Sequence, residues 1–130
     1  MRAFLVAGLS ALLVAACGPS TAVLPDPKPG TVDHVVIFWL KRPGNGDDKE
    51  RLHAAAGQLE AIPGVLAVRH GNVIASDREI VDDSFDLAYI ITFDSVESLR
   101  AYDPHPIHAK LAAEVARPLC RKILVYDVIH

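Results

Sequence analysis

The sequence predicts an α+β fold, in which a four-stranded sheet carries helices on one face. Two observations support this prediction. Four short runs rich in β-branched and aromatic residues are typical of strands, and segments between them show apolar residues at helical spacing. Along the chain the elements follow the order strand, helix, strand, strand, two-part helix, strand, which is the ferredoxin-like split β-α-β pattern.

The first strand and the first helix are predicted from their apolar patterns. Residues 34–40 read HVVIFWL and lead into the turn-rich segment KRPGNGDD. Asp47 or Asp48 can cap the helix that follows, and Pro63 with Gly64 ends it. The apolar residues that recur three and four apart along this helix, and should face the sheet, are Leu52, Ala55, Ala56, Leu59 and Ile62.

The second and third strands are expected at 65–74 and 86–93, on either side of an exposed polar connection. After the third strand, Asp94 and Glu97 can form a capping box, in which each side chain bonds the backbone of the other residue. This pattern predicts a short helix that begins next to the end of the strand.

A further helix is predicted from Pro106, which suits a first helical turn because its missing N–H is not needed there. Pro118 is expected to end this helix, and residues 122–129 form the last strand. The inner face of the helix is predicted to consist of Ile107, Leu111 and Val115.

The predicted strands are apolar on both faces, although a strand with one solvated face should alternate between apolar and polar residues. In the first strand, one side consists of His34, Val36, Phe38 and Leu40, and the other of Val35, Ile37 and Trp39. The predicted helices cover one face of the sheet, and the chain has no further predicted element that could cover the other face. We therefore expect a homodimer in which two sheets pack face to face and curl into a shared barrel, a dimeric α/β barrel.

The N-terminus resembles a bacterial lipoprotein signal. Residues 1–16 have a short basic start and an apolar run that is shorter than the roughly 20 residues needed to span a bilayer. The sequence VAAC resembles the site at which lipoproteins are cut and lipidated, so Cys17 is the predicted lipid anchor; the alternative is a plain signal peptide. Residues 17–32, with four prolines, should form an extended tether, and the folded domain occupies 33–130.

The residue after the cysteine and the charge of the chain bear on location and partners. Gly18 is similar to the residue found there in Gram-negative lipoproteins of the outer membrane, which predicts a cell-envelope protein, lipid-anchored and facing the periplasm. With 13 Lys plus Arg against 16 Asp plus Glu, the chain has no electrostatic footprint for nucleic acid. Lipidation of Cys17 would leave Cys120 without a disulfide partner, as a buried apolar filler.

The segment AYDPHPIHAK, residues 101–110, contains the candidate catalytic residues. If Pro106 begins a helix, His105 lies at its cap and His108 in its first turn, where the helix dipole disfavours a positive charge. His108 should then stay neutral and accept a proton, while the Tyr102 hydroxyl donates a hydrogen bond to a carbonyl oxygen. This arrangement predicts a cofactor-independent cyclase or isomerase that acts at the carbon next to a carbonyl.

Two other hypotheses fit the same residues. The protein can be a non-catalytic module that binds a small apolar molecule between helices and sheet, or a structural scaffold in which His105 and His108 only satisfy backbone groups. Together with His34 these imidazoles could ligate zinc, but histidines at such positions more often bond the backbone. No metal and no cofactor are therefore expected.

Several motifs taken together resemble the stress-responsive α/β-barrel (Dabb) domain over nearly all of residues 33–129. These are His34 at the start of the first strand, IPGV at 62–65, FDSVESLRAY at 93–102, HPIH at 105–108 and ILVYDV at 123–128. The resemblance implies a dimeric α+β barrel, in agreement with the argument from the two-sided strands.

The resemblance also implies roles for individual residues. A plant member of the family closes a linear polyketide by intramolecular aldol condensation without a cofactor, using a tyrosine and a histidine within a Tyr-x-x-His-Pro-x-His segment. The matching positions are Tyr102 and His108 as the acid/base pair, with His105 and His34 as binding residues. Leu87 stands where the plant enzyme has a further pocket histidine.

Overall fold

The computed structural model describes residues 27–130, so the predicted signal segment 1–16, Cys17 and most of the tether lie outside the described residues. Within the described range, no helix combines the length and the apolar character needed to cross a membrane. The elements are β1 (Val32–Leu40), α1 (Gly46–Leu59), β2 (Val65–Asn72), β3 (Leu87–Phe93), α2 (Val96–Tyr102), α3 (Pro106–Leu111), the π-helical turn η1 (Ala112–Ala116), α4 (Arg117–Leu119) and β4 (Cys120–Ile129).

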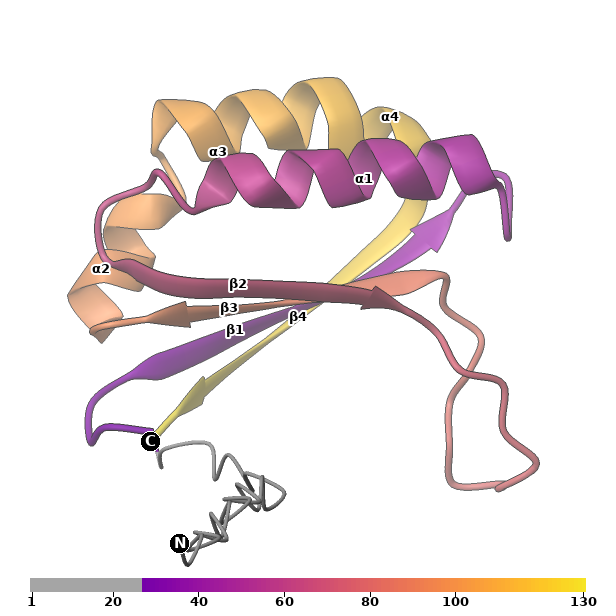
Figure 1. Cartoon of the computed structure of the whole chain (residues 1–130), viewed down its shortest axis with the longest axis horizontal. Coiled ribbons are helices and arrows are strands. Elements are labelled where there is room, and N and C mark those ends of the chain that lie inside the picture. The colour runs from indigo at the N-terminus through magenta and orange to yellow at the C-terminus, as the bar shows by residue number, and fades with distance from the viewer. Residues whose placement is uncertain (1–26) are drawn as a thin grey trace, which may run out of the picture.

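The four strands form one sheet in the order β2-β3-β1-β4, and every neighbouring pair is antiparallel. The helices all lie on one face of this sheet, with α1 and α3 across its middle and α2 at one end (Figure 1). The element order and the sheet order together confirm the predicted ferredoxin-like α+β fold. Strand β1 begins at Val32, and β2 ends at Asn72, two residues before its predicted end.

The core lies between the sheet and the helices. All five apolar residues predicted to form the inner face of α1 are at most 5% exposed. They pack against alternate residues of β1 and β3, among which Phe93, Leu87 and Ile91 are completely buried. Each such side chain stabilises the fold by roughly 1.5–3 kcal/mol through removal of apolar surface from water.

The predicted cap of α1 is wrong. Asn45, not Asp47 or Asp48, precedes the helix in an extended conformation, and its side-chain oxygen accepts a hydrogen bond of 3.0 Å from the backbone N–H of Asp48. Asp48 lies inside the first turn, where its buried carboxylate accepts hydrogen bonds from the guanidinium of Arg42. An asparagine next to Gly46 caps the helix earlier than the aspartates can.

The capping box predicted for α2 is also wrong, by one residue. Ser95 is the cap, and its hydroxyl accepts a hydrogen bond from the backbone N–H of Ser98. Asp94 instead accepts hydrogen bonds from the hydroxyls of Ser98 and Ser95, which lower the pKa of its carboxyl. The helix therefore begins one residue later than the sequence pattern indicated.

The start of α3 at Pro106 is confirmed, but Pro118 does not end the helical segment. The chain passes through the π turn η1 and continues as α4 to Leu119. A proline is tolerated there because it lies in the first turn of α4, where its missing N–H leaves no hydrogen bond unmade.

The face of the sheet opposite the helices is mostly apolar and is covered by no helix of residues 27–130. Trp39 is nevertheless only 4% exposed, because the Phe85 ring packs against its edge and the Lys122 Nζ lies 4.1 Å from its ring centroid. Other apolar side chains of this uncovered face, defined by the strand register, are Val35, Ile37, Ile90, Leu124, Tyr126 and Val128. Tyr126 is 56% exposed and Val128 48%.

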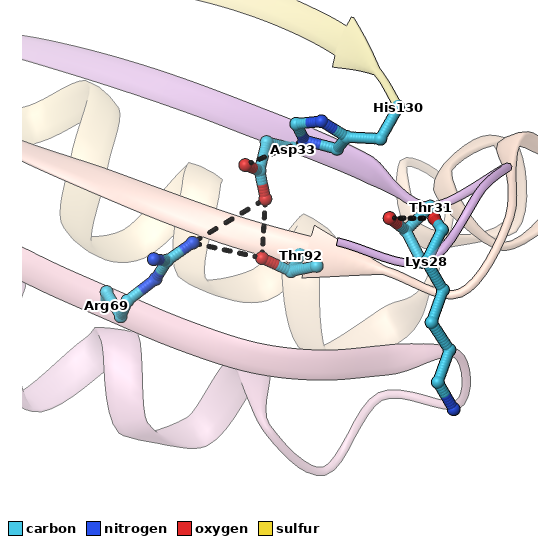
Figure 2. A network of polar contacts seen from close by, with 6 residues as sticks. All are labelled: Lys28, Thr31, Asp33, Arg69, Thr92 and His130. Carbon is cyan, nitrogen blue, oxygen red and sulfur yellow. Dashed lines mark hydrogen bonds and ion pairs between the residues drawn. The ribbon is translucent and has the colours of Figure 1, made fainter. Parts of the chain in front are cut away.

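One end of the uncovered face carries a polar network (Figure 2). The Thr92 hydroxyl donates to the Asp33 carboxylate at 2.5 Å, and the Arg69 guanidinium donates to the Thr92 hydroxyl at 3.2 Å. His130 Nε2 lies 3.2 Å from the other Asp33 oxygen. Burial raises the pKa of Asp33, but the hydrogen bonds from Thr92 and His130 and the charge of Arg69 outweigh it, so that the pKa is lowered overall.

Candidate functional site

A cavity of about 240 Å³ lies between the sheet, α1 and the segment from α3 to η1. Three of the predicted site residues, His34, Tyr102 and His108, line one end of it. The apolar side chains that form most of the remaining wall include Val36, Phe38, Leu52, Leu59, Leu111 and Val115. The space is thus mostly apolar with a polar cluster at one end, which is the usual composition of a small-molecule site.

The fold brings these three residues together from distant parts of the chain. Tyr102 is the last residue of α2 and packs edge-on against Phe93 of β3, with ring centroids 5.0 Å apart. Its ring lies 4.3 Å from the His108 ring of α3 and 5.7 Å from the His34 ring of β1. Two of the three residues, Tyr102 and His108, come from one sequence motif, and the third, His34, comes from the sheet.

His108 is oriented by the backbone. Its Nδ1 lies 2.8 Å from the carbonyl oxygen of Asp103, and since a carbonyl can only accept, Nδ1 carries the proton of this hydrogen bond. In neutral His108 the lone pair is therefore on Nε2. The side chain is held in the tautomer that a general base at Nε2 requires.

Tyr102 is held as a hydrogen-bond donor. Burial raises the pKa of its hydroxyl well above its ordinary value of 10.0, and the Asp103 carboxylate raises it further, so the hydroxyl stays protonated at neutral pH. Every fully buried side-chain N or O atom in residues 27–130 has a hydrogen-bond partner, but the Tyr102 hydroxyl has none among these residues. The hydroxyl must therefore be accessible from the hollows that Tyr102 lines.

His34 is oriented by a carboxylate that the sequence analysis missed. Asp127 of β4 stands directly opposite His34 in the strand register, and its Oδ1 lies 2.6 Å from His34 Nδ1. The carboxylate holds the ring with Nδ1 protonated and the lone pair of the neutral form on Nε2. The signal in the sequence was a charged residue at an inward position of an otherwise apolar strand, in KILVYDVI.

His105 and Leu87 lie apart from this cluster. His105 caps α3, where its Nδ1 accepts a hydrogen bond of 3.3 Å from the backbone N–H of Ile107, and it does not line the cavity. Leu87 is completely buried in the core. Across residues 27–130, no three His, Cys, Asp or Glu side chains are grouped so that they could hold a metal ion.

A surface groove of about 620 Å³ adjoins the cavity between α2 and the β4 edge. Asp127 and Arg100 line the groove, whereas His34, Tyr102 and Asp103 line both hollows. These three residues therefore form the wall between cavity and groove. A molecule in the cavity would contact His34, Tyr102 and His108, which are side-chain types that general acid–base chemistry uses.

Comparison with known proteins agrees with the fold. Residues 32–130 match the family model of the stress responsive A/B barrel domain, Dabb. No curated protein sequence matches the chain. Among solved structures, a Dabb family protein with a ferredoxin-like fold from Mesorhizobium loti is 24% identical with a TM-score of 0.65, and the match covers 78% of this chain and 97% of that one.

Two further solved structures share somewhat more of the sequence. The hydroxynitrile lyase of Passiflora edulis is 28% identical with a TM-score of 0.68, and the match covers 79% of this chain and 95% of the lyase. A dimeric ferredoxin-like protein of unknown function from a Jannaschia species is 27% identical with a TM-score of 0.60, and the match covers 78% of this chain and all 100% of that one. Because the family model spans the whole sheet and all the helices described above, this chain belongs to the stress responsive A/B barrel (Dabb) family.

Proposed function

We propose that this protein binds a small, largely apolar molecule with a carbonyl group in the cavity between the sheet and the helices. One observation carries the proposal: the Tyr102 hydroxyl, unpaired within residues 27–130, lies with His108 at one end of a mostly apolar cavity of about 240 Å³. An accessible donor at the end of an apolar space recognises a ligand whose body is apolar and whose oxygen accepts a hydrogen bond.

Calorimetric titration with 2-octanone, an apolar ketone, tests this proposal. We expect saturable binding, and Tyr102→Phe should weaken it about three- to tenfold, since a neutral hydrogen bond contributes about 0.5–1.5 kcal/mol. Tyr126→Phe is the matched control, because it removes a hydroxyl from the uncovered face of the sheet. Absence of binding, or equal affinity of the Tyr102→Phe variant and the wild type, would favour the structural scaffold instead.

A second candidate function is a cofactor-independent enzyme, and the anchored tautomer of His108 favours it. His108 Nε2 would take a proton from the carbon next to the carbonyl, and the electrons of the broken C–H bond would move onto the carbonyl oxygen, where Tyr102 donates a hydrogen bond. Returning the proton from His108 to another carbon gives an isomerase. Attack of the carbanion on a second carbonyl forms a C–C bond, and the oxygen of that carbonyl then takes the proton back from His108, which gives a cyclase. The likeness to a hydroxynitrile lyase, at 28% identity, also supports an enzymatic role.

Exchange of the α-hydrogens of 2-octanone in D₂O, followed by proton NMR, tests the enzyme hypothesis without knowledge of the natural substrate. The wild type should accelerate deuterium uptake, and His108→Ala should reduce this acceleration by about 10²–10⁴, the usual contribution of a positioned base. His105→Ala serves as a control, because His105 does not line the cavity. Exchange at the rate of the buffer would exclude His108 as a base for this ketone.

We also propose that two copies form a homodimer through the uncovered face of the sheet. The apolar side chains on that face, Tyr126 and Val128 above all, are open to water in the single chain. The Jannaschia protein, at 27% identity, is described as dimeric, which supports a dimer. Packing the two sheets together would remove this surface from water and leave the cavity of each copy on the outer, helical side.

Finally, we propose that the chain is a lipoprotein of the cell envelope, cut after residue 16 and anchored through Cys17 in the outer membrane, facing the periplasm. The VAAC motif followed by Gly18 supports this proposal. Expression in a Gram-negative host with an alkyne-bearing fatty acid should label the wild type, and Cys17→Ala should abolish both the label and recovery in the outer-membrane fraction. Labelling that persists in the variant would contradict the proposed anchor.

A further inference from the structure

The cavity has two chemically different ends. His34, Tyr102 and His108 form one end, and Arg117 lines the wall near the other. Of the described residues that line the cavity, Arg117 is the one with a permanent positive charge. Its guanidinium forms no ion pair or hydrogen bond with any residue in 27–130, although its main-chain oxygen accepts a hydrogen bond of 3.3 Å from Lys41 Nζ.

The strand register shows how far apart the two ends lie. His34 and Phe38 both face the cavity from β1, and four residues of a strand span about 13 Å. Phe38 pairs with Ile123, and just beyond this pair the backbone N–H of Lys41 donates to the carbonyl of Leu119, at the end of α4. Arg117, at the start of α4, therefore lies near the end of the cavity remote from His34.

The π turn brings Arg117 to this position. In a regular α-helix, residues five apart point about 140° away from each other, so Arg117 would point away from Ala112. In η1 the backbone N–H of Arg117 instead bonds to the carbonyl of Ala112, which places the two residues on the same side of the helix. Ala112 lines the cavity, and Arg117, although it is exposed to solvent, lines it from the same side of the helix. Such π turns occur frequently at functional sites.

We infer that the ligand of this cavity is an oxo acid, with its carboxylate bound by Arg117, its apolar chain along the cavity and its carbonyl group at Tyr102 and His108. This inference rests on the proposed function and adds the charge and orientation of the ligand. The planar guanidinium suits a carboxylate because it offers paired N–H donors. Asp103 lines the opposite end, and its carboxylate, although its side chain is 87% exposed to water, disfavours a second negative charge there.

The other charges near Arg117 leave this role open to it. The Asp48 carboxylate is engaged by Arg42, and the Asp86 carboxylate accepts hydrogen bonds from the backbone N–H groups of Leu40 and Gly44. Lys41 Nζ donates at 2.8 Å to the carbonyl of Pro118, which adds positive charge at this end. Glu114 of η1, three residues before Arg117, is the negative counterpart of Lys41 near this end.

The experiment compares 7-oxooctanoate with 2-octanone, which has the same ketone and chain but a methyl group in place of the carboxylate. Calorimetric titration of the wild type at low salt should show the oxo acid binding about fivefold more tightly, the upper range for an exposed ion pair. Arg117→Gln should abolish this difference and leave the affinity for 2-octanone unchanged. Arg121→Gln is the matched control, because Arg121 is exposed at the start of β4 and does not line the cavity.

The outcomes separate this inference from the proposed function. If 2-octanone binds but Arg117→Gln leaves the preference for the oxo acid intact, or Arg121→Gln abolishes it equally, Arg117 is not the carboxylate site and only the present inference is overturned. If the wild type binds 2-octanone and shows no preference for the oxo acid, the same conclusion holds. If neither compound binds, the proposed function fails, and the inference fails with it.

Discussion

Replacing Tyr126 by Asp puts a charge on the part of the uncovered face that is most open to water. Tyr126 lies on β4 directly opposite Val35 of β1, and its side chain points away from the helices. In the single chain it is 56% exposed, so the substitution removes little that holds one copy together. In the proposed dimer the same change would bury two carboxylates without partners.

The expected magnitude follows from the exposed area. A fully covered aromatic side chain buries roughly 200 Å², so the 56% of Tyr126 that is open corresponds to about 110 Å². At about 25 cal/mol per Å², its burial stabilises the dimer by about 2.8 kcal/mol per copy, and two-fold symmetry doubles this to about 5.6 kcal/mol. Buried area overestimates the free energy of association between proteins, so we take half of that sum as the expected loss. This loss corresponds to a dissociation constant of the dimer that is about a hundredfold larger in the variant than in the wild type.

Sedimentation velocity over a range of protein concentrations measures this change. The wild type should sediment as a dimer at micromolar concentration, and Tyr126→Asp as a monomer with an unchanged circular dichroism spectrum. Tyr126→Phe keeps the apolar area and should stay dimeric, as should Ala54→Asp, which adds the same charge on the exposed side of α1. A Tyr126→Asp variant that remains dimeric at all concentrations would refute the assignment of the interface to this face, and a monomeric wild type would refute the dimer itself.

Three further predictions concern single positions. Gly64→Ala should lower the free energy of unfolding, measured by urea titration, by roughly 1–3 kcal/mol, because Gly64 has a φ of 86° and a Cβ there would collide with α2. The control Gly57→Ala adds a methyl group in open space within α1, and it should instead raise the free energy of unfolding by about 0.5–1 kcal/mol. Asp33 has a folded-state pKa below its ordinary value of 3.8, so its stabilising effect is fully present above that pH and is lost as the pH falls through the lowered value. Asp33→Asn should therefore flatten the decrease of unfolding free energy below about pH 4, and an unchanged slope in urea titrations across this range would contradict the network. Asp127→Asn should remove the preference of His34 for a proton on Nδ1, which imidazole ¹⁵N shifts report directly, and shifts identical to the wild type would mean that Asp127 does not orient the ring.

The periodic spacing of apolar residues in the sequence was sufficient to predict the order of strands and helices. The spacing of Leu52, Leu59 and Ile62 predicted the buried face of α1, because a side chain's direction along a helix follows from its position alone. Strands that are apolar on both sides likewise predicted an apolar sheet face that the helices leave uncovered, because the direction of a side chain along a strand also follows from its position alone. The errors lie at helix ends, where Asn45 and Ser95 cap in place of neighbouring aspartates and the π turn carries the chain past Pro118. Several neighbouring short polar residues can cap each helix, and which of them does so depends on the backbone conformation of the segment that leads into the helix.

For the candidate site, the sequence alone identified Tyr102 and His108 as side chains that can donate and accept protons, since both stand within one short motif. The folded chain was needed to show that His34 joins them, that Asp127 orients it and that Arg117 lines the far end of the cavity. The first pair is close because of local backbone geometry, which a motif encodes. The other three depend on strand register and on a single extra residue in a helical turn, and both of these are set by packing between segments far apart in the chain.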